Sequence, residues 1–123
     1  MEAYANLPLE MKTEVVANVE FLKSVGNRLH KLDPASVQKF GEKLAEILSE
    51  KFLGHWYPEN PLQDQAYRCM SSNECYKDVC ILEACAYSGL RYDDLALPEP
   101  IVIWIDPFKV FSRCKDILDL NYA

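Results

Sequence analysis

The segment IVIWIDPFKVFSR, residues 101–113, decides the fold class of this chain. Its first part, Ile101 to Ile105, is β-branched or aromatic throughout, which is typical of a buried strand. Asp106-Pro107 interrupts that strand, because proline lacks the N–H that a strand ladder needs. Residues 108–113 then alternate between the two faces of an extended chain, which predicts a second strand after a tight turn.

Two further runs predict short strands before and after this pair in the chain. The run AYRCM, residues 66–70, follows a proline-containing loop and resembles a short strand. The C-terminal run ILDLNY, residues 117–122, alternates again after a possible turn over CKD, residues 114–116. Together these runs indicate a small, mainly antiparallel sheet of four strands.

Apolar residues recur at helical spacing upstream of the strands. Within residues 9–25 they fall four, four and three positions apart, which makes one apolar stripe. A second helix is expected from Asp33-Pro34 to about Phe52. Aspartate is a good helix cap and proline fits the first helical position, so the beginning of this helix is well marked.

A third helix is expected over residues 77–87, followed by a short helical turn over residues 93–95. Because helices come first and strands last, we predict an α+β domain in which about four to five helices form a layer on the sheet. Residues 1–123 have the length of a single domain. The inward face of the third helix is expected to hold Val79, Leu82 and Cys85 with Ala86.

Charge and hydropathy argue against two classes of partner. The net charge is −6 and the pI about 4.9, so phosphate attraction gives no general help and direct nucleic-acid binding is not expected. No signal peptide is visible, and no apolar run approaches the roughly 20 residues that span a bilayer. We therefore expect a soluble, intracellular protein that uses no membrane.

The five cysteines predict neither a metal site nor a disulfide framework. They occur as C-x5-C-x4-C-x4-C from Cys69 to Cys85, with Cys114 apart, and contain no C-x2-C pair. Cys69, Cys80 and Cys85 are interpreted as small buried hydrophobic residues in a reducing compartment.

Catalytic machinery is not recognisable either. His30 and His55 are the two imidazoles that could act as a base, and no nucleophile or phosphate-loop motif accompanies them. Four glycines leave little material for cofactor-binding loops. We predict no catalytic residue, no cofactor and no enzymatic activity.

Residue types that dominate protein interfaces are present. Tyr67 and Arg68 lie on the predicted strand after the proline loop, and Trp104 lies in an otherwise aliphatic strand. Trp104 could equally be a core residue, because tryptophan is usually mostly buried. The pattern alone leaves these two interpretations open.

Two segments together resemble signature boxes of the BTG/Tob antiproliferative family. HWYPENP followed by AYRC, residues 55–69, is similar to the first box, and LPEPIVIWIDPFKV, residues 97–110, is similar to the second. Their order and separation also fit, and the resemblance extends over residues 11–113. It identifies the chain as a divergent, short member of that family.

The resemblance implies a non-enzymatic adapter that restrains proliferation. Members bind the Caf-type exonuclease subunit of the Ccr–Not deadenylase, promote mRNA deadenylation and act as transcriptional co-regulators in cytoplasm and nucleus. The partner-binding positions of the family match Tyr67, Trp104 and Asp106 here. Contact with poly(A)-binding protein is not implied, because the third box is not recognisable.

Departures from the family pattern support an alternative function. Gln63-Asp64 replaces Lys-Gly, Ser71-Ser72 stands in a strand that is usually apolar and basic, and Lys109 replaces Glu. Cys114-Lys115 replaces Gly-Glu. The alternative is a diverged module that has lost deadenylase binding and engages another protein, such as a transcription factor.

Overall fold

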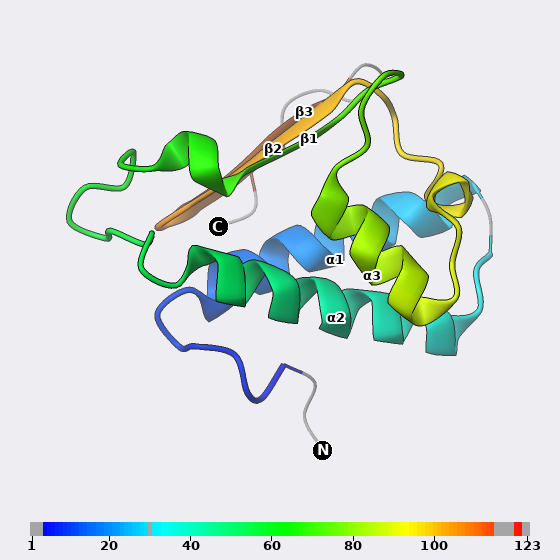
Figure 1. The fold of residues 1–123 in the computed structure, drawn as a ribbon, viewed down its shortest axis with the longest axis horizontal. Helices are drawn as coiled ribbons and strands as arrows, with labels where there is room; N and C mark the ends of the chain where they lie inside the picture. The colour runs from blue at the N-terminus through cyan, green and yellow to red at the C-terminus, as the bar shows by residue number, and fades with distance from the viewer. Residues whose placement is uncertain (1–3, 30, 115–119, 122–123) are drawn as a thin grey trace.

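Three α-helices lie against one face of a small antiparallel sheet (Figure 1). The computed structural model describes residues 4–29, 31–114 and 120–121. In chain order the elements are α1 (Lys12–Leu29), α2 (Pro34–Phe52), the 3-10 helix η1 (Gln65–Arg68), β1 (Cys69–Ser72), α3 (Val79–Ser88), the 3-10 helix η2 (Tyr92–Leu95), β2 (Ile101–Asp106), β3 (Lys109–Cys114) and β4 (Leu120–Asn121).

The second helix begins and ends where its sequence predicts. Asp33 caps α2 by accepting a hydrogen bond from the Ser36 N–H at 3.0 Å, and Pro34 is the first helical residue. Phe40, Leu44 and Leu48 of its apolar stripe are fully buried or nearly so, whereas Ile47 is partly buried. The first helix begins slightly later than expected, at Lys12, and continues to Leu29.

The orientation of α3 differs from the sequence prediction. Val79 is 60% exposed and Leu82 40% exposed, whereas Ile81 and Cys85 are buried. Because α3 is apolar on nearly every side, its pattern does not say which side faces the core. Asp78 joins the beginning of α3 to the sheet: its carboxylate caps α3 and also accepts from the Ser71 N–H of β1.

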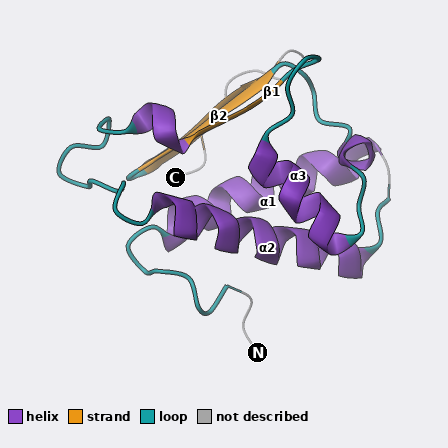
Figure 2. Ribbon diagram, viewed as in Figure 1, coloured by secondary structure: helices purple, strands orange, loops and turns teal. Residues whose placement is uncertain are grey.

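The sheet has the strand order β1-β2-β3-β4, with antiparallel pairing throughout. In β2 the side chains of Ile101, Ile103 and Ile105 are buried toward the helices. Val102 and Trp104 alternate with them and are half-buried on the opposite face. We call the face with Val102 and Trp104 the outer face of the sheet. The three α-helices all lie against the inner face, which carries the buried isoleucines (Figure 2).

The run AYRCM is only partly a strand. Hydrogen bonds from Gln65 N to Leu62 O and from Tyr67 N to Asp64 O continue a series of turns into η1. Ladder pairing therefore begins at Cys69, which pairs with Trp104. The serines do not interrupt β1, because Ser72 is buried and its Oγ accepts the Asp78 N–H at 3.0 Å.

The predicted element counts need correction. The described residues contain three α-helices rather than four to five, because η1 and η2 are four-residue 3-10 helices. Three strands have four to six residues, and the fourth, β4, is a two-residue pairing with β3. Most of the expected C-terminal turn and strand, residues 115–119 and 122, lies outside the described residues. Within the described part, no helix combines the length and apolarity needed to cross a bilayer.

Candidate protein-interaction site

Arg68, the last residue of η1, is fully buried. Its Nε donates to the carbonyl of Ile105 at 2.8 Å, and Nη1 donates to the carbonyls of His55 (2.8 Å) and Gln63 (2.6 Å). Nη2 donates to the carbonyl of Pro61 at 2.7 Å and to Asp106 Oδ1 at 3.2 Å. The five N–H donors of the guanidinium are thus all used inside the protein.

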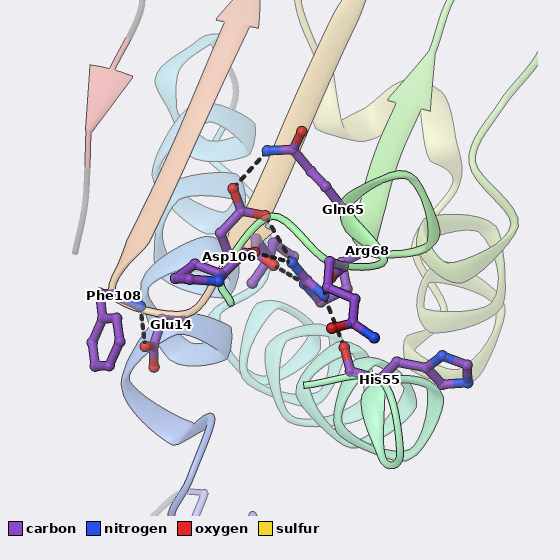
Figure 3. Close-up of polar contacts among 9 residues, drawn as sticks. Glu14, His55, Gln65, Arg68, Asp106 and Phe108 are labelled. Atoms are coloured by element: carbon purple, nitrogen blue, oxygen red, sulfur yellow. Dashed lines mark hydrogen bonds and ion pairs between the residues drawn. The ribbon is translucent and has the colours of Figure 1, made fainter. Parts of the chain in front are cut away.

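This burial corrects the interpretation of Arg68 as an interface residue. The guanidinium joins the proline-containing loop to the end of β2 (Figure 3). Its Cζ lies 5.5 Å from the ring centroid of Trp56. The sequence gives no direct signal for this role, because the acceptors come from 5 to 38 residues away along the chain.

Asp106, at the end of β2, is 3% exposed. One carboxylate oxygen accepts from Arg68, and the other accepts from Gln65 Nε2 at 2.7 Å. Figure 3 shows the carboxylate between these two donors, both of which belong to η1. In this arrangement Asp106 is occupied by intramolecular contacts.

Tyr67 differs from its neighbour, because it is 43% exposed. Its ring stacks on His55 with centroids 4.1 Å apart, and Lys51 Nζ lies 5.0 Å from its ring centroid. The imidazole N–H of His55 donates from Nδ1 to Asp64 Oδ2 at 2.9 Å. The tyrosine ring is therefore supported by His55 and Lys51 and is still partly exposed to solvent.

Trp104 lies on the outer face of the sheet. Its ring stacks on Phe111 of β3 with centroids 4.9 Å apart and an interplanar angle of 18°. Lys109 is exposed on the same face, with Nζ 4.9 Å from the centroid of the Phe111 ring. Trp104 is thus half-buried, so it is neither a fully buried core residue nor a fully exposed interface residue.

The structure links the sequence-predicted residues in two pairs. Tyr67 is in η1, whose first and last residues both bind Asp106. Trp104 precedes Asp106 by two residues in β2, so their side chains leave the same face of the strand. Asp106 therefore connects the two aromatic residues: it is hydrogen-bonded to η1, which carries Tyr67, and it lies in β2 with Trp104.

The cysteines do not form a site in the described part of the chain. Cys80 and Cys85 are buried as expected, but Cys69 is only half-buried on the outer face and Cys75 is exposed. Burial raises the pKa of the Cys85 thiol to about 11. Among the described residues, no three His, Cys, Asp or Glu side chains could hold a metal ion together. His30, the other candidate imidazole, lies outside the described residues.

The fold defined by these elements is that of a BTG/Tob domain. The solved C. elegans FOG-3 BTG/Tob domain superimposes with a TM-score of 0.77, covering 89% of this chain and 86% of that chain at 21% sequence identity. A family model described as BTG family matches residues 11–120. The chain belongs to the BTG family, which confirms the resemblance of the two boxes.

Curated relatives agree with this assignment. Mus musculus Protein BTG3 is 42% identical over 104 residues, which are 84% of this chain and 41% of that protein. Xenopus laevis Maternal B9.15 protein is 40% identical over 104 residues, which are 84% of this chain and 45% of that protein. The chain therefore spans less than half the length of these relatives.

The positions at which the sequence departs from the expected family pattern have definite places in the structure. Asp64 has φ 60°, a left-handed backbone that suits glycine, and its side chain accepts the His55 hydrogen bond. Gln63 and Lys109 are exposed. Asp64 thus places a negative charge close to Tyr67, and Lys109 places a positive charge close to the Trp104–Phe111 stack.

Proposed function

We propose that this domain is a non-enzymatic antiproliferative adapter that binds the Caf-type exonuclease subunit of the Ccr–Not deadenylase. In this function it brings mRNA deadenylation to selected transcripts, acts as a transcriptional co-regulator and works in both cytoplasm and nucleus. The contact surface includes Tyr67 and Trp104 and depends on Asp106. The support comes from family membership and from two aromatic side chains held, partly exposed, on defined elements.

The observation that carries the proposal is the support behind each aromatic ring. Tyr67 stacks on His55, and Trp104 stacks on Phe111. Rings fixed in this way lose little side-chain entropy when a partner covers them. Aromatic residues in such positions commonly supply most of the binding free energy of an interface.

Calorimetry with the purified exonuclease subunit tests this function. We expect micromolar or tighter binding, and a loss of about 2 kcal/mol or more for Trp104→Ala and for Tyr67→Ala. Tyr87→Ala is a matched control, because Tyr87 is an exposed aromatic residue on α3 that also lies beside a lysine. Equal, weak binding of wild type and Trp104→Ala would exclude the deadenylase as the partner.

The alternative function has its own support in the altered charges. Asp64 and Lys109 are exposed, and their charges differ from the expected family pattern. A partner that carries a like charge opposite either residue would bind less well, because like charges repel across an interface. In this case the domain engages another protein, such as a transcription factor. Proximity labelling in cells separates the two, since strong recovery of deadenylase subunits counts against the alternative.

A further inference from the structure

Asp106 binds both ends of the short helix that carries Tyr67 (Figure 3). Its Oδ2 accepts from Gln65, the first residue of η1, and its Oδ1 accepts from Arg68, the last. Tyr67 lies between these two anchors. A four-residue 3-10 helix has few hydrogen bonds of its own, so its orientation depends on anchors of this kind.

Arg68 extends the anchorage to the loop before η1. Its Nη1 donates to the carbonyl of His55, whose ring stacks on Tyr67. Arg68 is also the covalent neighbour of Tyr67. One buried side chain therefore holds both members of the His55–Tyr67 stack, and Asp106 orients that side chain.

Neither charge is presented to another molecule. Arg68 is 0% exposed and Asp106 is 3% exposed. Their hydrogen bonds go to each other, to the loop, to Gln65 of η1 and to the carbonyl of Ile105 in β2. Before Asp106 could bind a partner it would have to leave Arg68. That step would strand a buried guanidinium without its counter-charge, which is costly.

We propose that Asp106 and Arg68 are positioning residues of the interaction surface: they hold η1 and the His55–Tyr67 stack in place, and the Asp106 carboxylate does not touch the partner. The binding half of this inference rests on the proposed function. Its structural half concerns the free domain and can be measured without a partner.

Exchanging the two side chains of the Gln65–Asp106 pair tests the inference. Gln65→Glu places a second carboxylate against Asp106 and should weaken the anchor by repulsion. Adding Asp106→Asn restores an amide–carboxylate pair in reversed order, and the carbonyl oxygen of the new amide can still accept from Arg68. Asp106→Asn should therefore weaken binding when it is made alone and strengthen binding when it is made in the Gln65→Glu variant.

Two measurements are made on wild type, Gln65→Glu, Asp106→Asn and the double variant. Affinity for the exonuclease subunit should fall at least about tenfold in Gln65→Glu and return to within about threefold of wild type in the double variant. Hydrogen exchange of residues 54–68 in the free domain should speed up and recover in parallel. Gln38→Glu is the matched control, since Gln38 also donates to a carboxylate at 2.7 Å, but on an exposed helix face.

A different result overturns the inference. If Asp106→Asn weakens binding equally in both backgrounds while exchange of residues 54–68 recovers in the double variant, Asp106 contacts the partner directly. If wild type does not bind the exonuclease at all, the proposed function fails, and exchange alone decides the positioning role. If hydrogen exchange of residues 54–68 stays fast in the double variant, the positioning role of Asp106 and Arg68 is then excluded as well.

Discussion

The Glu14 carboxylate of α1 accepts a hydrogen bond from the backbone N–H of Phe108 at 2.8 Å, and so ties the first helix to the β2–β3 turn (Figure 3). Glu14 is buried, and Phe108 has a left-handed backbone with φ 72°. The turn directly follows β2, the strand that carries Trp104 and Asp106. The helical layer therefore fixes the end of the strand on which half of the candidate site is built.

Removal of this link should destabilise the domain. Glu14→Ala leaves the Phe108 N–H without its acceptor and is expected to lower the free energy of unfolding by about 1–3 kcal/mol. Urea denaturation followed by circular dichroism measures the change. Glu50→Ala, at an exposed position of α2, should change it by less than about 0.5 kcal/mol. Equal effects of the two substitutions would show that the turn does not depend on Glu14.

Arg68→Lys should be far from conservative. Lysine carries three donors at one point and cannot reach acceptors as far apart as the carbonyls of His55, Pro61 and Ile105. We expect a loss of about 3 kcal/mol or more of unfolding free energy, because buried acceptors and the Asp106 charge lose partners. The same denaturation experiment on Arg91→Lys, whose side chain is 80% exposed, should show almost no change.

Much of the fold could be predicted because several local signals agree. Asp33 and Pro34 mark the beginning of α2, the β-branched and aromatic run of residues 101–105 predicts β2, and the alternation in residues 108–113 predicts β3. The orientation of α3 could not be predicted, since a helix that is apolar all round has no preferred inward side in its sequence. Its inward side is defined by three-dimensional contacts, among them the packing of α3 on α2 and the hydrogen bonds of Asp78 with Ser71 and Ser72.

The exposed side of α3 leads to a prediction of tolerance. Leu82→Lys should change the unfolding free energy by less than about 1 kcal/mol, because Leu82 is substantially exposed. Ile81→Ala, at the adjacent buried position, should cost about 2–4 kcal/mol. Thermal or urea unfolding of the two variants checks the difference. A large loss in Leu82→Lys would mean that α3 packs in the orientation expected from the sequence.

The candidate site was only partly visible in the sequence. Residue type pointed to Tyr67 and Trp104, and the structure places both rings where a partner can reach part of their surface. Residue type misplaced Arg68, because arginine is common both at interfaces and in rare buried networks. Its acceptors are mostly backbone carbonyls, which no side-chain pattern reveals.

Thiol reactivity should follow the burial of the cysteines. Burial raises the pKa of Cys85 from 9.0 to about 11, so at pH 8 it carries roughly a hundredfold less thiolate than an ordinary thiol. Exposed Cys75 should therefore be alkylated by iodoacetamide first, and Cys85 only after denaturation. Peptide mapping by mass spectrometry at increasing times checks the order. Simultaneous labelling of both thiols in the folded protein would contradict the burial of Cys85.

Stability should fall in alkaline solution, and Tyr92 should account for part of the fall. Burial, together with its hydrogen bond to Glu99 at 2.8 Å, raises the pKa of Tyr92 above its usual value of 10.0. Because the folded state holds this proton more tightly, the contribution is fully present below pH 10 and is lost as the pH rises further.

Tyr92→Phe isolates that contribution, since phenylalanine keeps the ring but has no proton to lose. The variant should be less stable than wild type by about 1–2 kcal/mol at pH 8, because Glu99 Oε2 loses the Tyr92 hydroxyl as a donor while Oε1 still accepts from Lys77. The difference in unfolding free energy should shrink between about pH 10 and pH 11.5. In this range unfolded wild type releases the phenolic proton while the folded state still holds it, which favours unfolding of the wild type only, because the variant has no such proton. Urea unfolding at several pH values measures both curves. Curves that stay parallel throughout this range would show that the proton on Tyr92 does not stabilise the fold.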